Sequence, residues 1–371
     1  MLGNPDITAS SRIHGMAVHQ KLRELGYNSV IAYKPLFTEE EIPFGFSECK
    51  KFESLISVGD IVVLQKIKST TNLSIIKYFK KLQPKIILID CDLPISIDVG
   101  KLADTIICTS QILCNHYKAI GQQVFYIEDS PELYFNNSNK KEKDILECFW
   151  FGDGSYPKWD EVIWLRNIID KISDRWKLIT ISNHPEATLQ WNLNSLEDLK
   201  NADAVVLPIL IDNENNSVKS ANRLQAMALS IPVVCSRLPS YAGVITHNKD
   251  GMICENETEW IEALKKLEDK TVRQQMSEEA YATAKNYSLD IAINTWIKEL
   301  GLKENFKTND SNKMIETEIA LNNLFYRTLL RKNVNYFKLM SWSLPNTFWA
   351  IYGMLFQALK KFGFKPLGRN T

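Results

Sequence analysis

The stretch Lys219–Pro232, K-S-A-N-R-L-Q-A-M-A-L-S-I-P, followed by V-V-C-S, decides the fold of this chain. It predicts a polar loop, then a helix that Ser220 can cap, then a buried strand. The first turn of a helix offers free backbone N–H groups and a partial positive charge, and Lys219 and Arg223 add two full charges beside it. Such an end suits a diphosphate, because arginine binds phosphate oxygens in a bidentate manner. The same residues also suit an ordinary capped helix with solvated Lys and Arg side chains.

Short apolar strands alternate with helices on both sides of this stretch. Strands that are apolar on both faces are typical of parallel sheets covered by helices, and the alternating order predicts a doubly wound α/β fold in each half of the chain. Gly26 stands where a cap at the end of the first helix belongs. We expect strands at 28–33, 61–65, 85–90, 105–109, 148–151, 177–181, 204–208 and 231–235, and helices at 11–25, 71–82, 159–172, 195–201, 220–229, 257–267 and 271–284.

Composition separates the two halves from each other and from the C-terminal region. The segment N-N-S-N-K-K-E-K at 136–143 is polar and charged, which indicates a linker. The first half opens M-L-G-N-P, so we expect either a sheet short by one strand or a reading frame that begins upstream. The expected parts are an N-terminal Rossmann-like domain at 1–137, a linker at 138–145, a second Rossmann-like domain at 146–300 and a helical basic and aromatic tail at 301–371.

Bulk composition places the chain in a broad class. Of 371 residues, 45% are hydrophobic and 24% charged, which is typical of a globular protein that needs neither disulfides nor structural metal. The seven cysteines form no C-x-x-C pair, which indicates a reducing compartment. We find no signal-peptide pattern and no apolar run long enough to span a bilayer, and we expect a cytoplasmic protein. Nucleic acid is not an expected partner.

The stretch at 219–236 resembles a signature of group 1, family 4-like glycosyltransferases with the two-domain GT-B fold, in which a phosphate-contacting segment leads into L-E-A-M-A-x-G-x-P-V-V. The likeness continues through Pro239, Asp250-Gly251 and Glu259-Trp260. It implies two Rossmann-like domains facing a cleft, with the nucleotide-sugar donor on the second, and a role in bacterial surface-polysaccharide assembly.

The resemblance also assigns candidate residues. The loop F-G-D-G-S-Y-P-K at 151–158 occupies the place of a basic residue that reaches the donor phosphates, and A-S-S-R-I at 9–13 looks like the first-domain loop that faces the cleft. The catalytic residues are not identified. The implied donor-phosphate residues are Lys219, Ser220, Asn222, Arg223 and Lys158; the ribose residue is Gln225; the base residues are His184 and Trp191; the first-domain cleft residues are Ser10, Ser11, Arg12 and Asp92.

Three positions depart from the family pattern. Gln225 replaces the ribose-binding glutamate, Ser230 replaces a glycine, and Ser217 stands where the first acidic residue of an E-x7-E pattern belongs. A glutamine still hydrogen-bonds a ribose hydroxyl, but as a neutral partner. A K-S-x-N-R variant of the segment fits this chain better. A catalytically silent nucleotide-sugar-binding module, an epimerase and a phosphorylase therefore stay open as alternatives.

Asp90-Cys91-Asp92 supplies a second alternative. A D-x-D at a strand end holds a divalent metal in the other glycosyltransferase fold, GT-A, where the metal bridges the diphosphate. A second Rossmann-like series with its own phosphate-type helix favours GT-B. We therefore expect a metal-independent glycosyltransferase, without a cofactor, that transfers a sugar from a nucleotide diphosphate and stabilises the leaving diphosphate electrostatically. The family resemblance implies retention of the anomeric configuration and a glycan or lipid-linked acceptor.

The C-terminal region suggests a further partner. Residues 305–371 hold ten Lys and Arg against three Asp and Glu, and aromatic residues recur at helical spacing over 347–362. An aromatic helix face with basic flanks suits an anionic membrane surface, which would place the protein peripherally on the inner face of a membrane. The alternative is that this helix packs back across the first domain.

Overall fold

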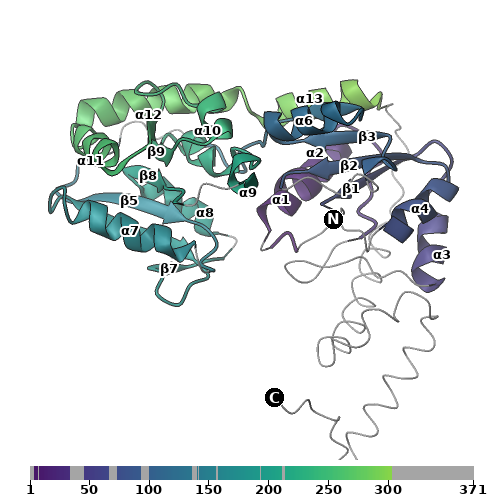
Figure 1. The fold of residues 1–371 in the computed structure, drawn as a ribbon, viewed down its shortest axis with the longest axis horizontal. Coiled ribbons are helices and arrows are strands. Elements are labelled where there is room, and N and C mark those ends of the chain that lie inside the picture. Colours follow the sequence, from purple (N-terminus) through teal and green to yellow (C-terminus); the bar gives the residue numbers. More distant parts are fainter. Residues whose placement is uncertain are drawn as a thin grey trace, which may run out of the picture.

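The computed structural model of the protein describes residues 4–6, 8–33, 46–66, 73–92, 100–135, 140, 142–155, 158–192, 194–210 and 214–302. The predicted helical tail, beyond residue 302, lies outside the described residues. Figure 1 shows two α/β units side by side, the first in purple and blue and the second in teal and green. In the part of the chain that is described, no helix is long and apolar enough to cross a bilayer.

The first unit contains a four-stranded parallel sheet in the order β1-β2-β3-β4. Its strands alternate their side chains between two buried faces, so that Ile86 and Leu88 pack on one side and Ile87 and Ile89 on the other. Helices α3, α4 and α6 cover the first of these faces. The bounds are β1 Ile61–Gln65, β2 Lys85–Asp90, β3 Thr105–Cys108 and β4 Val124–Tyr126, with α3 Phe46–Leu55, α4 Leu73–Lys81 and α6 Gln111–Ala119.

The first helix differs in detail from its expected form. It runs as α1 (Ala9–Ser11), a π-helical turn (Arg12–Ala17) and α2 (Val18–Glu24), and Gly26 follows in a left-handed conformation with φ 86°. π-helical turns are rare and occur frequently at functional sites. The expected helix and its glycine cap are therefore confirmed, with an unexpected widening over the segment that carries Arg12.

The prediction of a strand at 28–33 is wrong. These residues are described but do not belong to either sheet. A strand needs a neighbour whose backbone accepts and donates its ladder hydrogen bonds, and within the described residues the sheet begins at β1. The apolar, β-branched pattern indicates burial, which Tyr33 has at 5% exposure, but it does not supply a partner.

The second face of the first sheet is covered by the last described helix, α13 (Leu289–Leu300). Ile293, Trp296 and Leu300 are buried in one cluster with Ile87, Ile89 and Ile107 of the sheet and with Val18 and Leu22 of α2. Figure 1 accordingly shows α13 over the first unit. Sequence order alone assigns this helix to the second domain at 146–300, whereas its packing joins it to the first.

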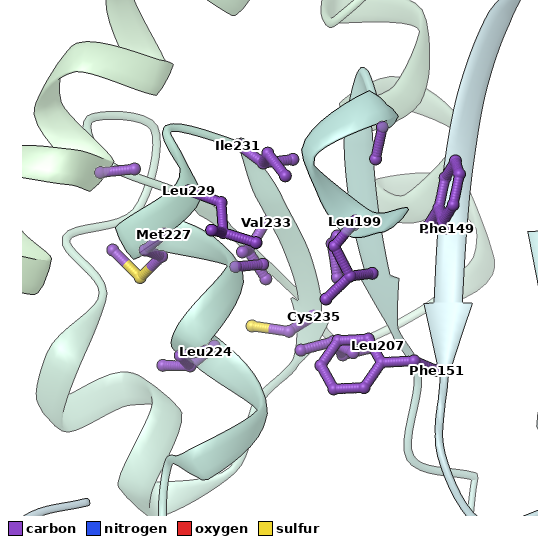
Figure 2. Close-up of a cluster of buried hydrophobic side chains, with 14 of the residues drawn as sticks. Phe149, Phe151, Leu199, Leu207, Leu224, Met227, Leu229, Ile231, Val233 and Cys235 are labelled. Carbon is purple, nitrogen blue, oxygen red and sulfur yellow. The ribbon is translucent and has the colours of Figure 1, made fainter. Parts of the chain in front are cut away.

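The second unit contains a six-stranded parallel sheet in the order β10-β9-β8-β5-β6-β7. Helices α7 and α11 pack on one face, and α8, α12 and the 3-10 helix η4 pack on the other. Figure 2 shows the second of these clusters, in which Leu224, Met227 and Leu229 of η4 meet the strands. The strands are β5 Leu146–Phe151, β6 Trp176–Ser182, β7 Leu189–Gln190, β8 Ala204–Leu207, β9 Val233–Ser236 and β10 Met252–Cys254. The helices are α7 Trp159–Ile169, α8 Ser195–Asp198, α9 Glu214–Ser217, η4 Asn222–Leu229, α10 Pro239–Val244, α11 Glu257–Lys266 and α12 Lys270–Lys285.

The strand order of the second sheet defines a switch point. From β5 the chain proceeds to β6 and β7 on one side, and then returns to add β8, β9 and β10 on the other side of β5. In open α/β sheets, ligands bind outside the carboxyl ends of the strands at such a point. The loop at 152–155 follows β5, and the loop at 208–210 follows β8, so both stand at the switch point.

The helix expected at 220–229 has a different form. It is a 3-10 helix that begins at Asn222, and no side chain caps its N-terminus. It ends at Ser230, whose φ of 55° and ψ of 47° are left-handed. That conformation favours glycine and explains why the family pattern has glycine where this chain has serine.

The described part of the predicted linker is fastened to the second unit. Glu142 accepts hydrogen bonds from Arg273 at 2.9 and 3.1 Å, and Lys143 lies 3.1 Å from Glu147 and 3.2 Å from Asp203. The segment is polar, as expected, but its charges are used in ion pairs rather than left in solvent.

Candidate functional site

The residues after α9 meet the end of β5 at the switch point. Arg223 donates a hydrogen bond from Nη2 to the carbonyl oxygen of Phe151 at 2.6 Å. Its guanidinium carbon lies 5.5 Å from the ring centres of both Trp150 and Phe151, and Nη1 lies 3.8 Å from Glu161. Cation–π contacts and the hydrogen bond together fix this side chain. Arg223 is therefore an anchored positive charge at the carboxyl end of the central strand.

Lys219 is the second cation of the segment and is half-buried. Its Nζ donates to the neutral side-chain oxygen of Asn216 at 2.6 Å. Burial lowers the pKa of Lys219, and the charges of Lys158 and Arg223 lower it further, against opposing effects of Asp92 and Glu161. Three cations thus converge on one place, an arrangement that a bound anion would stabilise.

Lys158, the third cation, follows the glycine-bearing loop after β5. Its Nζ lies 3.2 Å from Asp153 Oδ2, and nearly half of the side chain is exposed. Burial raises the pKa of Asp153, but hydrogen bonds from Ser155 and the charge of Lys158 outweigh it and lower the pKa to about 2. Asp153 is therefore ionised at neutral pH, and Lys158 has a carboxylate partner that a phosphate group would have to replace or share.

The same loop lies tightly against the end of β6. Gly154 donates its backbone N–H to Asn183 Oδ1 at 2.6 Å. A Cβ atom added at Gly154 would stand 2.4 Å from the Cβ of His184 and 2.8 Å from its backbone nitrogen, which leaves no room for any other residue. The glycine is therefore required for the loop to pack at the switch point.

The two residues expected to bind the nucleotide base, His184 and Trp191, both lie at the end of β6. His184 donates its backbone N–H to Ser182 Oγ at 3.2 Å, and its ring stacks on that of Trp159 with the ring centres 3.8 Å apart and 12° between the planes. Trp191 donates its backbone N–H to the Ser182 carbonyl oxygen at 2.9 Å, while its buried indole Nε1 has no hydrogen-bond partner among the residues that the structure describes. Both residues are therefore bonded to Ser182 at the end of β6, and their assignment to the nucleotide base stays a prediction.

The expected first-domain residues face the same region. Arg12 lies with its guanidinium carbon 5.6 Å from the ring centre of Trp191, and it forms an ion pair with Glu132 at 2.6 Å. Asp92 pairs with Lys66 and interacts electrostatically with Lys219. The hydroxyls of Ser10 and Ser11 are bonded to Gln65 at the end of β1. Arg12 and Asp92 thus reach the second unit's site residues, whereas the two serines hold the first helix to its sheet.

The remaining expected residues lie on or beside η4. Asn222 and Gln225 are half-buried on this helix. Ser220 is buried and donates its hydroxyl proton to Asp129 Oδ2 at 2.6 Å. The predicted phosphate-binding serine is therefore engaged with a carboxylate of the segment that follows β4.

The D-x-D sequence is divided between two roles. Asp90 is 1% exposed and accepts a hydrogen bond from the Tyr117 hydroxyl at 2.5 Å, whereas Asp92 forms its ion pair with Lys66. Among the residues that the structure describes, no group of three or more His, Cys, Asp or Glu side chains is placed to hold a metal ion.

Sequence reasoning missed Glu128 and Asp129, which follow β4 where the chain leaves the first sheet. Asp129 Oδ1 lies 2.8 Å from His14 Nε2, and its other oxygen holds Ser220. Glu128 Oε1 accepts the backbone N–H of Ala221 at 3.5 Å. The signal was two adjacent acidic residues at the end of an apolar strand, a position where polar side chains meet ligands or neighbouring domains.

Glu128 should make the stability of the protein depend on pH. Burial and the charge of Asp129 raise the pKa of Glu128 to about 7 from an ordinary 4.5. The folded protein therefore keeps a proton that the unfolded chain loses, and its stability should fall as pH rises from about 4.5 to about 7, by on the order of 1–3 kcal/mol. Glu128→Gln should flatten this part of the profile in urea denaturation at pH 5 and pH 8.

The exposed Glu197 provides the matched control, since Glu197→Gln removes a carboxylate that is 61% exposed. The Glu197 variant should keep the pH dependence of the unmodified chain. An unchanged profile in the Glu128 variant would show that this carboxyl does not titrate in the expected range.

Comparison with known proteins finds a family that resembles part of the chain. Residues 190–283, which include β8, η4, β9 and most of α12, match the family model of glycosyl transferases group 1. No curated protein sequence matches the chain significantly.

Several solved structures share the fold. Sucrose-phosphate synthase from Thermosynechococcus elongatus has a TM-score of 0.54 at 11% identity, over 74% of this chain and 82% of its own. HepE from Anabaena, in complex with UDP and glucose, has a TM-score of 0.53 at 13% identity, over 68% and 80%. A variant of TarM from S. aureus, in complex with fondaparinux, alpha-GlcNAc-glycerol and UDP, has a TM-score of 0.52 at 11% identity, over 68% and 58%. This chain thus spans less than two thirds of TarM.

The fold and the family match agree. At these identities the solved structures establish the fold, which is the two-domain GT-B arrangement. The family match covers the segment that carries Lys219 to Arg223. The segment at 190–283 is therefore similar to glycosyl transferases group 1, the chain has the GT-B fold, and the resemblance expected from its sequence is confirmed.

Proposed function

We propose that this protein is a glycosyltransferase that takes its sugar from a nucleotide diphosphate bound at the switch point of the second sheet. The observation that carries the proposal is Lys219, a half-buried cation with a neutral hydrogen-bond partner, whose burial and two cationic neighbours outweigh the opposing effect of Asp92 and Glu161. Burying a charge beside like charges is unfavourable unless a ligand compensates it. A diphosphate provides compensating charge of the right sign.

The cations have separate tasks in this proposal. Arg223 is hydrogen-bonded to the end of β5 and keeps its positive charge in one place, whereas the Lys219 ammonium would exchange its hydrogen bond to Asn216 for one to a phosphate oxygen. Lys158 adds a third positive charge from the loop that follows β5. As the bond between the sugar and the diphosphate breaks, negative charge grows on the leaving phosphate, and preorganised cations stabilise it most strongly at that moment.

The nature of the substrates is a further part of the proposal. The neighbours HepE and TarM were solved with UDP, which makes a uridine nucleotide the first donor to test. We propose a glycan or lipid-linked acceptor and retention of the anomeric configuration, as the family resemblance implies. Incubation with a panel of nucleotide sugars, with detection of released nucleotide and of sugar transferred to an acceptor, tests this reaction.

Transfer should survive chelation of divalent cations. The diphosphate site is built from Lys219, Arg223 and Lys158, which supply the charge that a metal supplies elsewhere. Activity in excess EDTA should therefore stay within about twofold of the untreated enzyme. Loss of activity in EDTA, with recovery on addition of Mn²⁺ or Mg²⁺, would favour the metal-dependent alternative.

A silent nucleotide-sugar-binding module remains the second candidate. The observations that favour it are Gln225 on η4, a neutral residue where the family pattern has a glutamate, and Ser217 in place of the first acidic residue. Nucleotide binding without hydrolysis or transfer of any donor in the panel would select this candidate over the enzyme.

The protein should associate peripherally with membranes through its C-terminal region. This proposal rests on the sequence, in which residues 305–371 combine aromatic side chains with ten basic and three acidic residues. Each basic residue close to an anionic surface contributes about 1 kcal/mol, so the full chain should float with phosphatidylserine-containing liposomes at low salt. Chain 1–304 should stay in the soluble fraction; equal behaviour of the two forms would contradict the proposal.

A further inference from the structure

The segment that carries Lys219 is held on both sides by the first unit. Immediately before it, the carbonyl oxygen of Val218 accepts a hydrogen bond from Ser110 Oγ at 2.6 Å. Immediately after it, Ser220 Oγ donates to Asp129 Oδ2 at 2.6 Å. Lys219 belongs to the second unit in sequence, yet both of its neighbours are bonded to the first.

Packing strengthens this attachment. The Val218 side chain is buried at 6% exposure within the hydrophobic cluster of the first unit, together with Leu113 and Tyr117 of α6. One residue of the second unit thus completes the core of the first. The backbone on the N-terminal side of Lys219 is therefore fixed by an apolar contact as well as by a hydrogen bond.

The two anchoring residues are themselves immobilised. Ser110 is 3% exposed and caps the N-terminus of α6, where its Oγ also accepts a hydrogen bond from the Leu113 backbone N–H at 3.4 Å. Asp129 is 7% exposed and lies 2.8 Å from the imidazole of His14, on the π-helical turn. Hydrogen bonds in such buried places are strong and directional, because no water competes for them.

We propose that Ser110 and Asp129 are positioning residues that hold Lys219 against the donor diphosphate, so that the first unit completes the nucleotide site of the second. The inference rests on the proposed function of Lys219. A lysine side chain is flexible and strongly hydrated, and it binds an anion most tightly when its backbone is already placed. Fixing the residues on either side restricts where the ammonium can reach and lowers the entropy lost on binding.

If Ser110 and Asp129 hold Lys219 in place, nucleotide affinity depends on the contact between the two units. Separation of the units would break both hydrogen bonds and free the segment on each side of Lys219. Residues of the first unit that do not touch the nucleotide should therefore change its affinity, and they should do so only while Lys219 is present.

A double-mutant cycle tests this coupling. Nucleotide affinity is measured by calorimetry with UDP, GDP, ADP and dTDP, each alone, for Ser110→Ala, Asp129→Ala, Lys219→Ala and the combinations with Lys219→Ala. Ser110→Ala and Asp129→Ala should each weaken binding of the preferred nucleotide about threefold to tenfold. In the Lys219→Ala background the same changes should have little further effect.

Two further variants separate positioning from a general loss of structure. Ser110→Thr keeps the hydroxyl group, which donates to the Val218 carbonyl oxygen and caps α6. This variant should therefore bind the nucleotide more tightly than Ser110→Ala. Ser173→Ala removes a hydroxyl-to-carboxylate hydrogen bond of similar length, 2.7 Å to Glu268, elsewhere in the second unit, and should leave affinity unchanged. Thermal unfolding of every variant establishes that it folds, so that Ser110→Ala carries the test if Asp129→Ala does not fold.

The outcomes are distinct. If Lys219→Ala weakens binding but the first-unit variants bind normally, the positioning inference is overturned and the proposed function stands. Equal effects of Ser110→Ala with and without Lys219 would also overturn it. If no nucleotide binds, or if Lys219→Ala binds like the unmodified chain, the proposed function fails, and the inference fails with it.

Discussion

Replacing Lys219 by alanine should weaken the binding of a nucleoside diphosphate by about tenfold or more. A hydrogen bond to a charged group contributes about 1.5–3 kcal/mol, and every 1.4 kcal/mol is about a factor of ten in affinity. The same change should leave the stability of the ligand-free protein unaltered or raise it, because Lys219 is half-buried beside Lys158 and Arg223. Calorimetry with nucleoside diphosphates and thermal unfolding measure the two quantities.

Opposite effects on binding and stability distinguish a ligand-binding residue from a structural one. Lys219→Arg keeps the charge and should retain more affinity than Lys219→Ala. Lys200 is a matched control in the same unit, an exposed lysine 3.9 Å from Glu197, and Lys200→Ala should change neither quantity. A drop in stability with unchanged affinity would assign Lys219 a structural role instead.

The second large effect, a loss of stability, should follow from a change in α13, the helix that packs on the sheet of the first unit. Trp296 is 2% exposed between α13 and the sheet, in the cluster that includes Ile87 and Ile107. Trp296→Ala removes a large buried side chain and should lower the free energy of unfolding by about 3–5 kcal/mol. Urea denaturation followed by circular dichroism measures this change without relying on tryptophan fluorescence.

Ile291 on the same helix is the control for this experiment. Its side chain is 49% exposed, so Ile291→Ala should change the free energy of unfolding by no more than about 0.5 kcal/mol. Similar small effects in both variants would mean that α13 does not hold to the first sheet in solution.

Local patterns determine much of what the structure contains. The apolar runs predict strands at 61–65 and 85–90, and these are the bounds of β1 and β2. A parallel strand that is buried on both faces is a continuous apolar run, which can be recognised without knowing the strands that pair with it. The pattern at 28–33 is similar, yet no strand forms there, since pairing depends on a partner elsewhere in the chain.

The site was predictable where one segment carries it and unpredictable where distant segments meet. Lys219 and Arg223 lie in one stretch of sequence, and Lys158 lies in a separate loop that the family resemblance implied. The structure brings the charges of Lys158 and Arg223 close enough to act on Lys219. The bond between Ser220 and Asp129 joins residues 91 positions apart, and nothing local to either residue reveals the other. The 3-10 form of η4 was missed for a different reason, because the spacing of apolar residues does not separate a short 3-10 helix from an α-helix.

A structure of the protein with a bound nucleoside diphosphate tests the central claim most directly. Crystals grown or soaked with UDP, GDP, ADP or dTDP should show the diphosphate at the carboxyl ends of β5 and β8, within hydrogen-bond distance of Lys219 Nζ. A diphosphate bound elsewhere, for example through a divalent cation on Asp92, would contradict the account.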